Sequence, residues 1–146
     1  MRAVIGIDAA WTLTEPSGVA LVVEDRGWRL AAVAPSYDAF IGIAHGEPAS
    51  VARTRGSLPD AVALIAAART MSKSAIDLVA IDMPLSREPI TSRRASDRAV
   101  NVAYSARWCS THTPSAVRPG KISDDFRSDF EAAGYPLRTT VAKAPG

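Results

Sequence analysis

Two aspartates each stand at the end of a short apolar run. Asp8 closes the run 4–8 (VIGID), and Asp82 follows the apolar part of 77–85 (DLVAIDMPL), which Pro84 ends. β-Branched runs of this length are typical of strands that are buried on both faces. If the two strands are parallel neighbours, both carboxylates lie at the same edge of the sheet, with backbones about 5 Å apart.

Two carboxylates at that separation repel each other, and a divalent cation removes the repulsion. Mg²⁺ or Mn²⁺ accepts such oxygen ligands and keeps water molecules that a substrate phosphate can replace. We therefore predict a metal site at Asp8 and Asp82. The alternative is that each aspartate only caps its strand and binds the following turn. Asp124 and Asp125 are further candidate ligands, although their expected place in the first turn of a helix favours dipole stabilisation.

An arginine-rich segment follows the second aspartate strand. Residues 93–107 (RRASDRAVNVAYSAR) contain four arginines, and Arg94 and Arg98 are the candidates for holding a substrate phosphate. The alternative is a solvated helix face on which Asp97 pairs with Arg94 or Asn101. Four arginines near a metal site give it a local positive field that the whole chain, at a net charge of +2, does not have.

Other common chemistries have weak support in the sequence. Cys109 and His112 have a Cys-x-x-His spacing, but a second such pair is absent, so a zinc site is not expected. The sequence has neither the GxSxG motif of serine hydrolases nor a Walker loop, and the first apolar run is not followed by GxGxxG.

The elements that must position these residues predict a mixed α/β fold. Strands are expected at 4–8, 18–23 and 28–33, joined by short connections into an antiparallel meander. A helix is expected over 36–45, and a second from a capping pair at Ser57 and Asp60 to about Met71. These cross over to a parallel strand at 77–85. Helices are then expected over 93–108 and from Ser123 to Gly134, followed by a strand that begins at 137–141.

Composition indicates one soluble domain. The chain has 146 residues, enough for one sizeable core, and its 17 Lys and Arg nearly balance its 15 Asp and Glu. Cys109 is the single cysteine, so an intrachain disulfide is excluded and a reducing compartment is expected. The apolar runs are far shorter than a bilayer requires. We expect a cytoplasmic protein with no membrane partner.

Four spaced motifs resemble a known family. GIDAAW at 6–11, AIDMPLS at 80–86, RRASDRA at 93–99 and WCSTHTPSAVRPG at 108–120 together resemble the family called domain of unknown function 429. This family is similar to the ribonuclease H-like superfamily, and its members are described as predicted nucleases.

The resemblance implies a ribonuclease H-like sheet in which Asp8 and Asp82 bind the catalytic Mg²⁺ or Mn²⁺. It implies hydrolysis of phosphodiester bonds, with nucleic acid as the expected partner. Members of the family continue beyond the length of this chain, so residues 1–146 are expected to be one such domain, incomplete at its C-terminus.

Two other functions fit the same elements. An actin-like phosphotransferase also begins with a strand, an aspartate and a meander, but its phosphate loops are Gly-rich, whereas the first connection here (AAWTLTEPSG) has its glycine only at position 18. The other alternative is a non-catalytic binding or structural module. An exposed edge strand makes a homodimer a further expectation.

Overall fold

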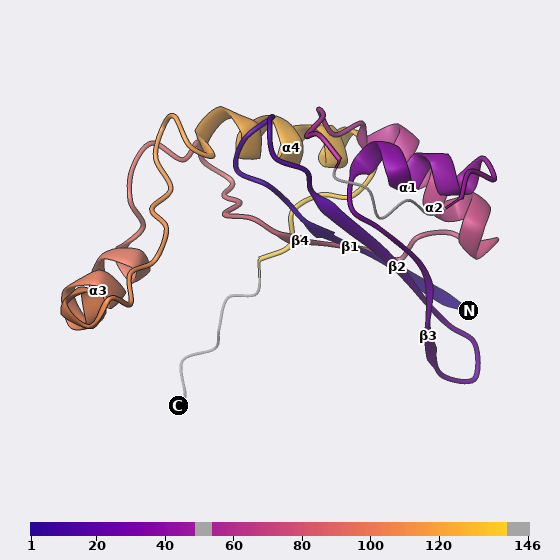
Figure 1. Ribbon diagram of the computed structural model, residues 1–146, viewed down its shortest axis with the longest axis horizontal. Helices are drawn as coiled ribbons and strands as arrows, with labels where there is room; N and C mark the ends of the chain where they lie inside the picture. Colours follow the sequence, from indigo (N-terminus) through magenta and orange to yellow (C-terminus); the bar gives the residue numbers. More distant parts are fainter. Residues whose placement is uncertain (49–53, 140–146) are drawn as a thin grey trace.

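The computed structural model describes residues 1–48 and 54–139 as a four-stranded sheet with helices on one face (Figure 1). In chain order the elements are β1 (Arg2–Asp8), β2 (Gly18–Glu24), β3 (Trp28–Ala34), α1 (Tyr37–Ala44), α2 (Ala61–Ser72), β4 (Leu78–Asp82), α3 (Ala95–Tyr104), the 3-10 turn η1 (Ser105–Arg107) and α4 (Gly120–Ala132).

The strand order is β3-β2-β1-β4. The first three strands are antiparallel neighbours, whereas β4 pairs with β1 in parallel. A parallel neighbour needs a crossover, and α1 and α2 provide it between β3 and β4. The mixed α/β class, the meander and the parallel fourth strand are therefore confirmed.

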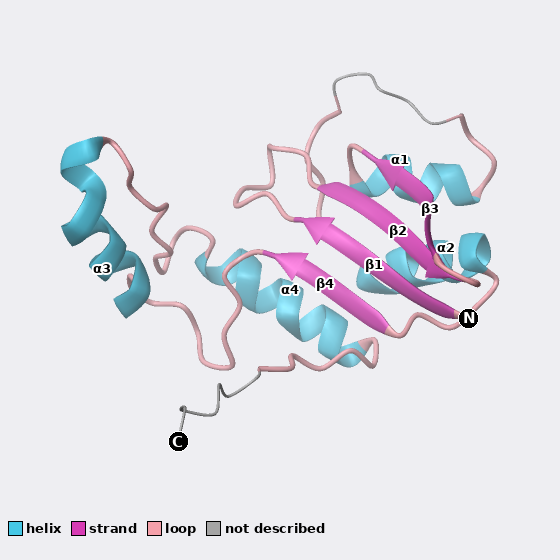
Figure 2. Cartoon of the chain, turned by 90° about the horizontal axis from the view of Figure 1, so that it is seen from below, coloured by secondary structure: helices cyan, strands magenta, loops and turns pink. Residues whose placement is uncertain are grey.

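The two faces of the sheet have different surroundings. Along β1, Ala3, Ile5 and Ile7 are fully buried under α1, α2 and α4, because alternate side chains of a strand point to opposite faces. Val4, Gly6 and Asp8 belong to the other face, which no helix covers in the described chain (Figure 2). We call this second surface the open face.

The core lies between the sheet and the three covering helices. Phe40 of α1, Leu64 of α2 and Phe126 of α4 are fully buried against strand residues such as Leu21. Phe126 stacks between two other rings, with centroids 6.3 Å from Tyr37 and 5.0 Å from Phe130. This aromatic cluster attaches α4 to the body of the protein.

The first two helices agree with the expected order but differ in detail. Ser36 caps α1 by accepting the Ala39 amide at 3.2 Å, as predicted. The expected capping pair of α2 is wrong in part, because Asp60 alone is the N-cap and accepts the Ala63 amide at 2.9 Å. Ser57 instead donates its hydroxyl to Asp38 at 3.2 Å, so the helix begins three residues later than Ser57 suggests.

Leu58, Val62, Ile65 and Ala66 recur at helical spacing, which predicts that they form the buried face of α2, and the prediction is partly wrong. Leu58 and Val62 are exposed, whereas Leu64, Ile65 and Ala68 are buried. The face of the helix that packs against the core is therefore rotated relative to the predicted face, and Ile65 belongs to the predicted face and to the observed one.

The last helix starts earlier than predicted. Ser123 is not its cap, because the Ile122 and Ser123 amides already donate to the Pro119 carbonyl, at 2.7 and 3.4 Å. Ser123 is buried within the helix, and its hydroxyl donates to the Gly120 carbonyl at 2.8 Å. Asp124 and Asp125 consequently lie beyond the first turn.

The end of α4 is confirmed and the strand after it is not. Gly134, at a φ of +93°, follows the helix, as predicted. Residues 137–139 are not in a strand, and 140–141 lie outside the described residues.

α3 stands apart from the sheet, at the end of the molecule opposite the N-terminus (Figure 1). We call residues 93–108, which contain α3 and η1, the arm. Asp97 is the buried residue of α3, and it accepts two hydrogen bonds from Arg94, Nε to Oδ2 at 2.7 Å and an η nitrogen to Oδ1 at 3.0 Å. The predicted pairing of Asp97 with Arg94 is confirmed.

Candidate functional site

Asp8 and Asp82 are direct partners in the parallel register of β1 and β4. Each is the last residue of its strand, and both are exposed on the open face. The strands remain paired to this point, because the Ala9 amide donates to the Asp82 carbonyl at 3.4 Å. Adjacent strands lie about 4.8 Å apart, so the two carboxylates belong to one site.

Small residues lie next to the aspartates on the open face. Gly18 is the partner of Asp8 on β2, and a Cβ at Gly18 would lie 3.8 Å from the Cβ of Asp8. Gly6 and Ala80 form the neighbouring row. These residues line a shallow hollow of about 610 Å³ that reaches both aspartates.

The site is negatively charged and lacks an internal counter-ion. Within the described residues, neither Asp8 nor Asp82 forms an ion pair with Arg, Lys or His. Two exposed carboxylates on adjacent strands repel each other, and together they offer hard oxygen ligands. The donor set fits Mg²⁺ or Mn²⁺ held by two carboxylates, with water filling the other positions.

The set of ligating side chains is small. Over residues 1–48 and 54–139, no group of three or more His, Cys, Asp and Glu side chains is placed to hold a metal ion. Asp124 and Asp125, the other candidates from the sequence, lie on α4, which packs on the opposite, helix-covered side of the sheet. A metal at Asp8 and Asp82 would therefore depend on these two carboxylates and water.

The two candidate phosphate-binding arginines lie on the arm. Arg94 is engaged by Asp97, whereas Arg98 is exposed on the same helix. The hydrogen bonds from Arg94, together with its positive charge, hold the pKa of the Asp97 carboxyl below its usual value. The sequence predicts that Arg94 and Arg98 lie near the aspartates. The arm stands beyond the end of the sheet, so the structure does not bring these arginines together with Asp8 and Asp82 (Figure 1).

Trp11 and His112 contact each other although they lie far apart in the sequence. Their rings are 5.7 Å apart in an edge-to-face arrangement. Trp11 follows Asp8 by three residues, in the connection from β1 to β2, and His112 lies in the loop that returns from the arm. His112 is exposed on this loop.

Residue spacing does not predict this contact, because His112 has a Cys-x-x-His spacing with Cys109 and no second such pair that would complete a zinc site. The signal in the sequence is that Trp11 and His112 each fall within one of the motifs that carry the family resemblance, GIDAAW and WCSTHTPSAVRPG.

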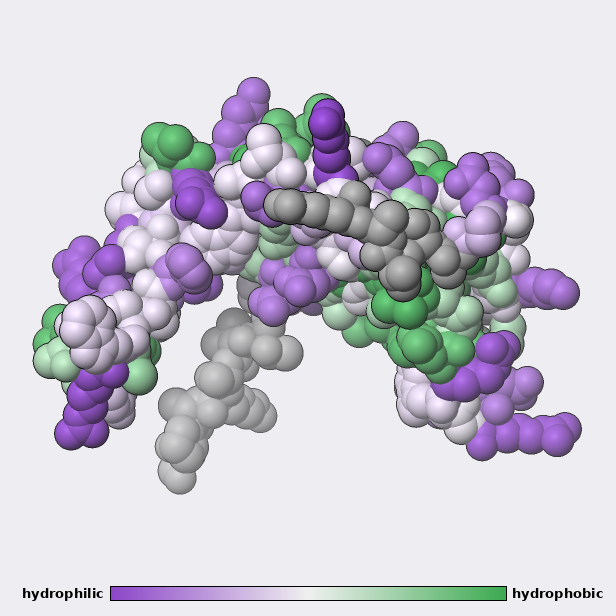
Figure 3. Space-filling model, viewed as in Figure 1, coloured by the Kyte–Doolittle hydropathy of each residue, from purple (hydrophilic) through white to green (hydrophobic). Residues whose placement is uncertain are grey.

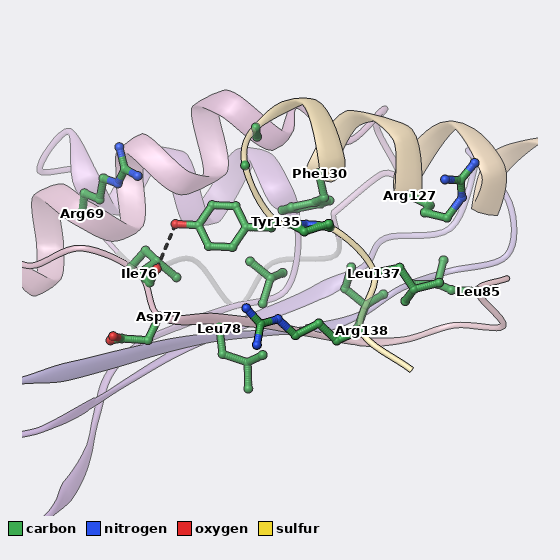
Figure 4. A pocket seen from close by; sticks show the side chains of 15 residues that line it. Arg69, Ile76, Asp77, Leu78, Leu85, Arg127, Phe130, Tyr135, Leu137 and Arg138 are labelled. Carbon is green, nitrogen blue, oxygen red and sulfur yellow. Dashed lines mark hydrogen bonds between the residues drawn. The ribbon is translucent and has the colours of Figure 1, made fainter. Parts of the chain in front are cut away.

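A second cavity, of about 510 Å³, lies along the outer edge of β4, with α4 and residues 135–138 as its other walls (Figure 4). Arg69, Arg127 and Arg138 line it together with Asp77. The Tyr135 hydroxyl donates to the Ile76 carbonyl at 2.9 Å and closes one end. Neither Asp8 nor Asp82 lines this cavity, so it is separate from the aspartate site.

Comparisons with family models, with curated proteins and with solved structures find no match to this chain. Among the described helices, none is both long and apolar enough to cross a membrane.

Proposed function

We propose that this chain is a ribonuclease H-like domain that hydrolyses phosphodiester bonds of nucleic acid with the help of Mg²⁺ or Mn²⁺. The observation that carries the proposal is the register of Asp8 with Asp82 at the carboxyl ends of two parallel strands. Because the chain has one cysteine, we also propose that it acts in a reducing compartment, the cytoplasm.

The surroundings of the aspartates favour a ligand site over two strand caps. A side chain that caps its own strand end would accept hydrogen bonds from the next backbone amides. Among the described hydrogen bonds, the Ala10 amide beyond β1 instead donates to the Ser17 hydroxyl, at 3.0 Å. The Ala9 amide donates to the backbone carbonyl of Asp82. The described hydrogen bonds of these two amides therefore do not go to the Asp8 carboxylate, and the Asp8 and Asp82 side chains are both exposed.

In this proposal, Asp8 and Asp82 would hold the cation at the sheet edge. The chemistry that a divalent ion would supply there is activation of water and neutralisation of charge on the leaving oxygen. Arg98 is the arm residue proposed to hold a substrate phosphate, with Arg94 as the second candidate once its pairing with Asp97 is exchanged for the substrate. His112 lies on the loop beside Trp11 and is a candidate proton donor or acceptor near the same edge.

The test is a hydrolysis assay on single-stranded and duplex DNA and RNA with Mn²⁺ or Mg²⁺. We expect cleavage that requires the metal, that EDTA stops, and that Asp8→Asn and Asp82→Asn each reduce by at least about 100-fold, in line with losses for residues that position charge in a transition state. Asp25→Asn is the matched control, because Asp25 is an exposed aspartate in the turn between β2 and β3.

Two results would contradict the proposal. One is cleavage that survives both substitutions, which would assign the chemistry to other residues. The other is a folded protein without cleavage of any of the four substrates in either metal, which would favour the non-catalytic module.

A further inference from the structure

Two apolar surfaces of this chain have no covering element. The first is one face of α3, formed by Ala95, Ala99 and Val102 at positions i, i+4 and i+7, which share a helix face. Val102 is 83% exposed. The opposite side of the helix is occupied, because the Asn101 side chain accepts the Thr111 amide at 2.8 Å. Apolar side chains are visible in green on the surface of the arm (Figure 3).

The second surface is the open face of the sheet. Two apolar rows cross all four strands there, and their register is given by the strand pairs. The first row consists of Leu78, Val4, Val22 and Leu30, and the second of Ala80, Gly6, Ala20 and Val33. The outer members remain exposed, with Val33 at 57%. The small residues in the centre of the second row leave room for a packed helix, since a Cβ at Gly6 would meet no atom within 4 Å.

We propose that α3 of one chain packs on the open face of a second copy, and that the second copy returns the same contact. Each chain offers one helix face and one sheet face, so a two-fold arrangement pairs both surfaces of both copies. Burying these residues removes apolar surface from water, which favours association.

The packing at the base of the arm explains why α3 contacts the open face of a second copy and not the open face of its own chain. Ile90, Pro114 and Pro119 are buried where the arm leaves and rejoins the body. The backbone is tightly packed there, because a Cβ at Gly120 would lie 2.8 Å from the Ser115 carbonyl oxygen. The contact of His112 with Trp11 fixes the returning loop as well. This packing holds α3 beyond the end of its own sheet (Figure 1).

Charge supports the same pairing. The arm carries Arg93, Arg98 and Arg107 in addition to the paired Arg94 and Asp97. The open face ends in Asp8 and Asp82, which have no ion pair in the described chain. Basic and acidic groups thus lie at the edges of the two apolar surfaces, and complementary charge fixes the orientation of an interface.

The apolar rows stop one row before the aspartates, so a helix packed on them leaves both carboxylates at its edge. The interface goes beyond the proposed hydrolysis and does not depend on it, because it rests on apolar packing and charge alone.

The first test is the mass of the chain in solution, measured by sedimentation velocity over a range of concentrations. We expect twice the 15.4 kDa chain mass for the parent protein. Val102→Asp in the arm and Val33→Asp on the open face should each shift the mass to that of a single chain. Val62→Asp is the control, because Val62 is 69% exposed on α2, on the helix-covered side, and should leave the dimer intact.

Val102→Asp and Val33→Asp also distinguish this interface from other ways in which two copies could pair. A monomeric parent would overturn the proposal. A dimer that Val102→Asp breaks but Val33→Asp does not would also overturn it, since this result would mean that the arms pair with each other.

A cross-linking experiment distinguishes exchange between copies from closure within one chain. In a Cys109→Ser background, one chain carries Val102→Cys and a second, of different tagged mass, carries Val33→Cys. We expect a disulfide-linked pair of the two chains after oxidation. A chain carrying both cysteines that closes only on itself, together with no linked pair in the mixture, would overturn the proposal.

Discussion

Arg94 and Asp97 form a bidentate ion pair one helical turn apart, and Asp97 is the residue of α3 that is buried. The Arg94 hydrogen bonds and charge hold the pKa of this carboxyl below its ordinary value. A group whose folded-state pKa is lowered stabilises the folded form above its unfolded pKa, and that contribution is lost as pH falls through the lowered value.

Acidification should therefore loosen the arm before it unfolds the body. Asp97→Asn should produce the same loosening at neutral pH, because it removes the charge that Arg94 binds. Amide hydrogen exchange of α3 measures the effect, and we expect faster exchange in the variant and, for the parent, at acidic pH once the rates are corrected for intrinsic exchange. Ser96→Ala is the control on the same helix, because Ser96 is exposed. Equal protection of α3 in the parent and in Asp97→Asn would contradict this account of the arm.

The aromatic cluster around Phe126 should carry a large share of the stability. Phe126 is 1% exposed, and its loss leaves a cavity between α4 and Tyr37. We expect Phe126→Ala to lower the free energy of unfolding by about 3–5 kcal/mol, the usual range for a buried phenylalanine. Denaturant unfolding measures this quantity. Val62→Ala should change it by less than about 0.5 kcal/mol, because Val62 is on the surface. A similar small loss for Phe126→Ala would mean that α4 is not anchored as described.

Tyr37 should titrate above an ordinary tyrosine. Burial raises the pKa of its hydroxyl, and a side-chain hydrogen bond with Ser17 offsets part of that rise. Because the folded-state pKa is the higher one, its contribution to stability is full below the unfolded pKa and is lost as pH rises through the folded value. Ultraviolet absorbance in an alkaline titration measures this, with Tyr37→Phe removing the late-titrating component. Uniform titration of all three tyrosines at their ordinary pKa would contradict the burial of Tyr37.

Much of the sheet could be predicted from the sequence, because the apolar runs that form strands are local. The β-branched run that ends at Asp8 marks one strand, and the apolar run before Asp82 marks its parallel partner. The burial on both faces that such runs suggest is wrong, because one face of β1 and of β4 belongs to the open face. The structure pairs these two strands at one edge of the meander and sets Asp8 opposite Asp82.

Contacts between distant segments could not be predicted in the same way. The start of α2 depends on Asp38, which takes the Ser57 hydroxyl and so prevents it from capping the helix. The start of α4 depends on the Pro119 carbonyl, and not on the acidic residues that usually mark a first turn. The meeting of Trp11 and His112 depends on the path of a loop, and loop paths leave little periodic signal in a sequence.

The arm shows the same limit. Helix-forming residues predict a helix at 93–108, and the structure has one at Ala95–Tyr104. Where that helix lies relative to the sheet is decided by the packing of Ile90, Pro114 and Pro119 at its root. The sequence placed Arg94 and Arg98 near the aspartates by their distance along the chain, whereas their position in space depends on the arm.

The most direct test of the central claim is a calorimetric titration of this chain with Mn²⁺, beside Asp8→Asn, Asp82→Asn and the control Asp25→Asn. We predict saturable binding in the parent and in Asp25→Asn, and loss of that binding in both of the other variants, since two carboxylates on adjacent strands supply the protein ligands. Circular dichroism establishes that each variant is folded. Binding that is absent from a folded parent, or that survives both substitutions, would contradict the assignment of the metal site to Asp8 and Asp82.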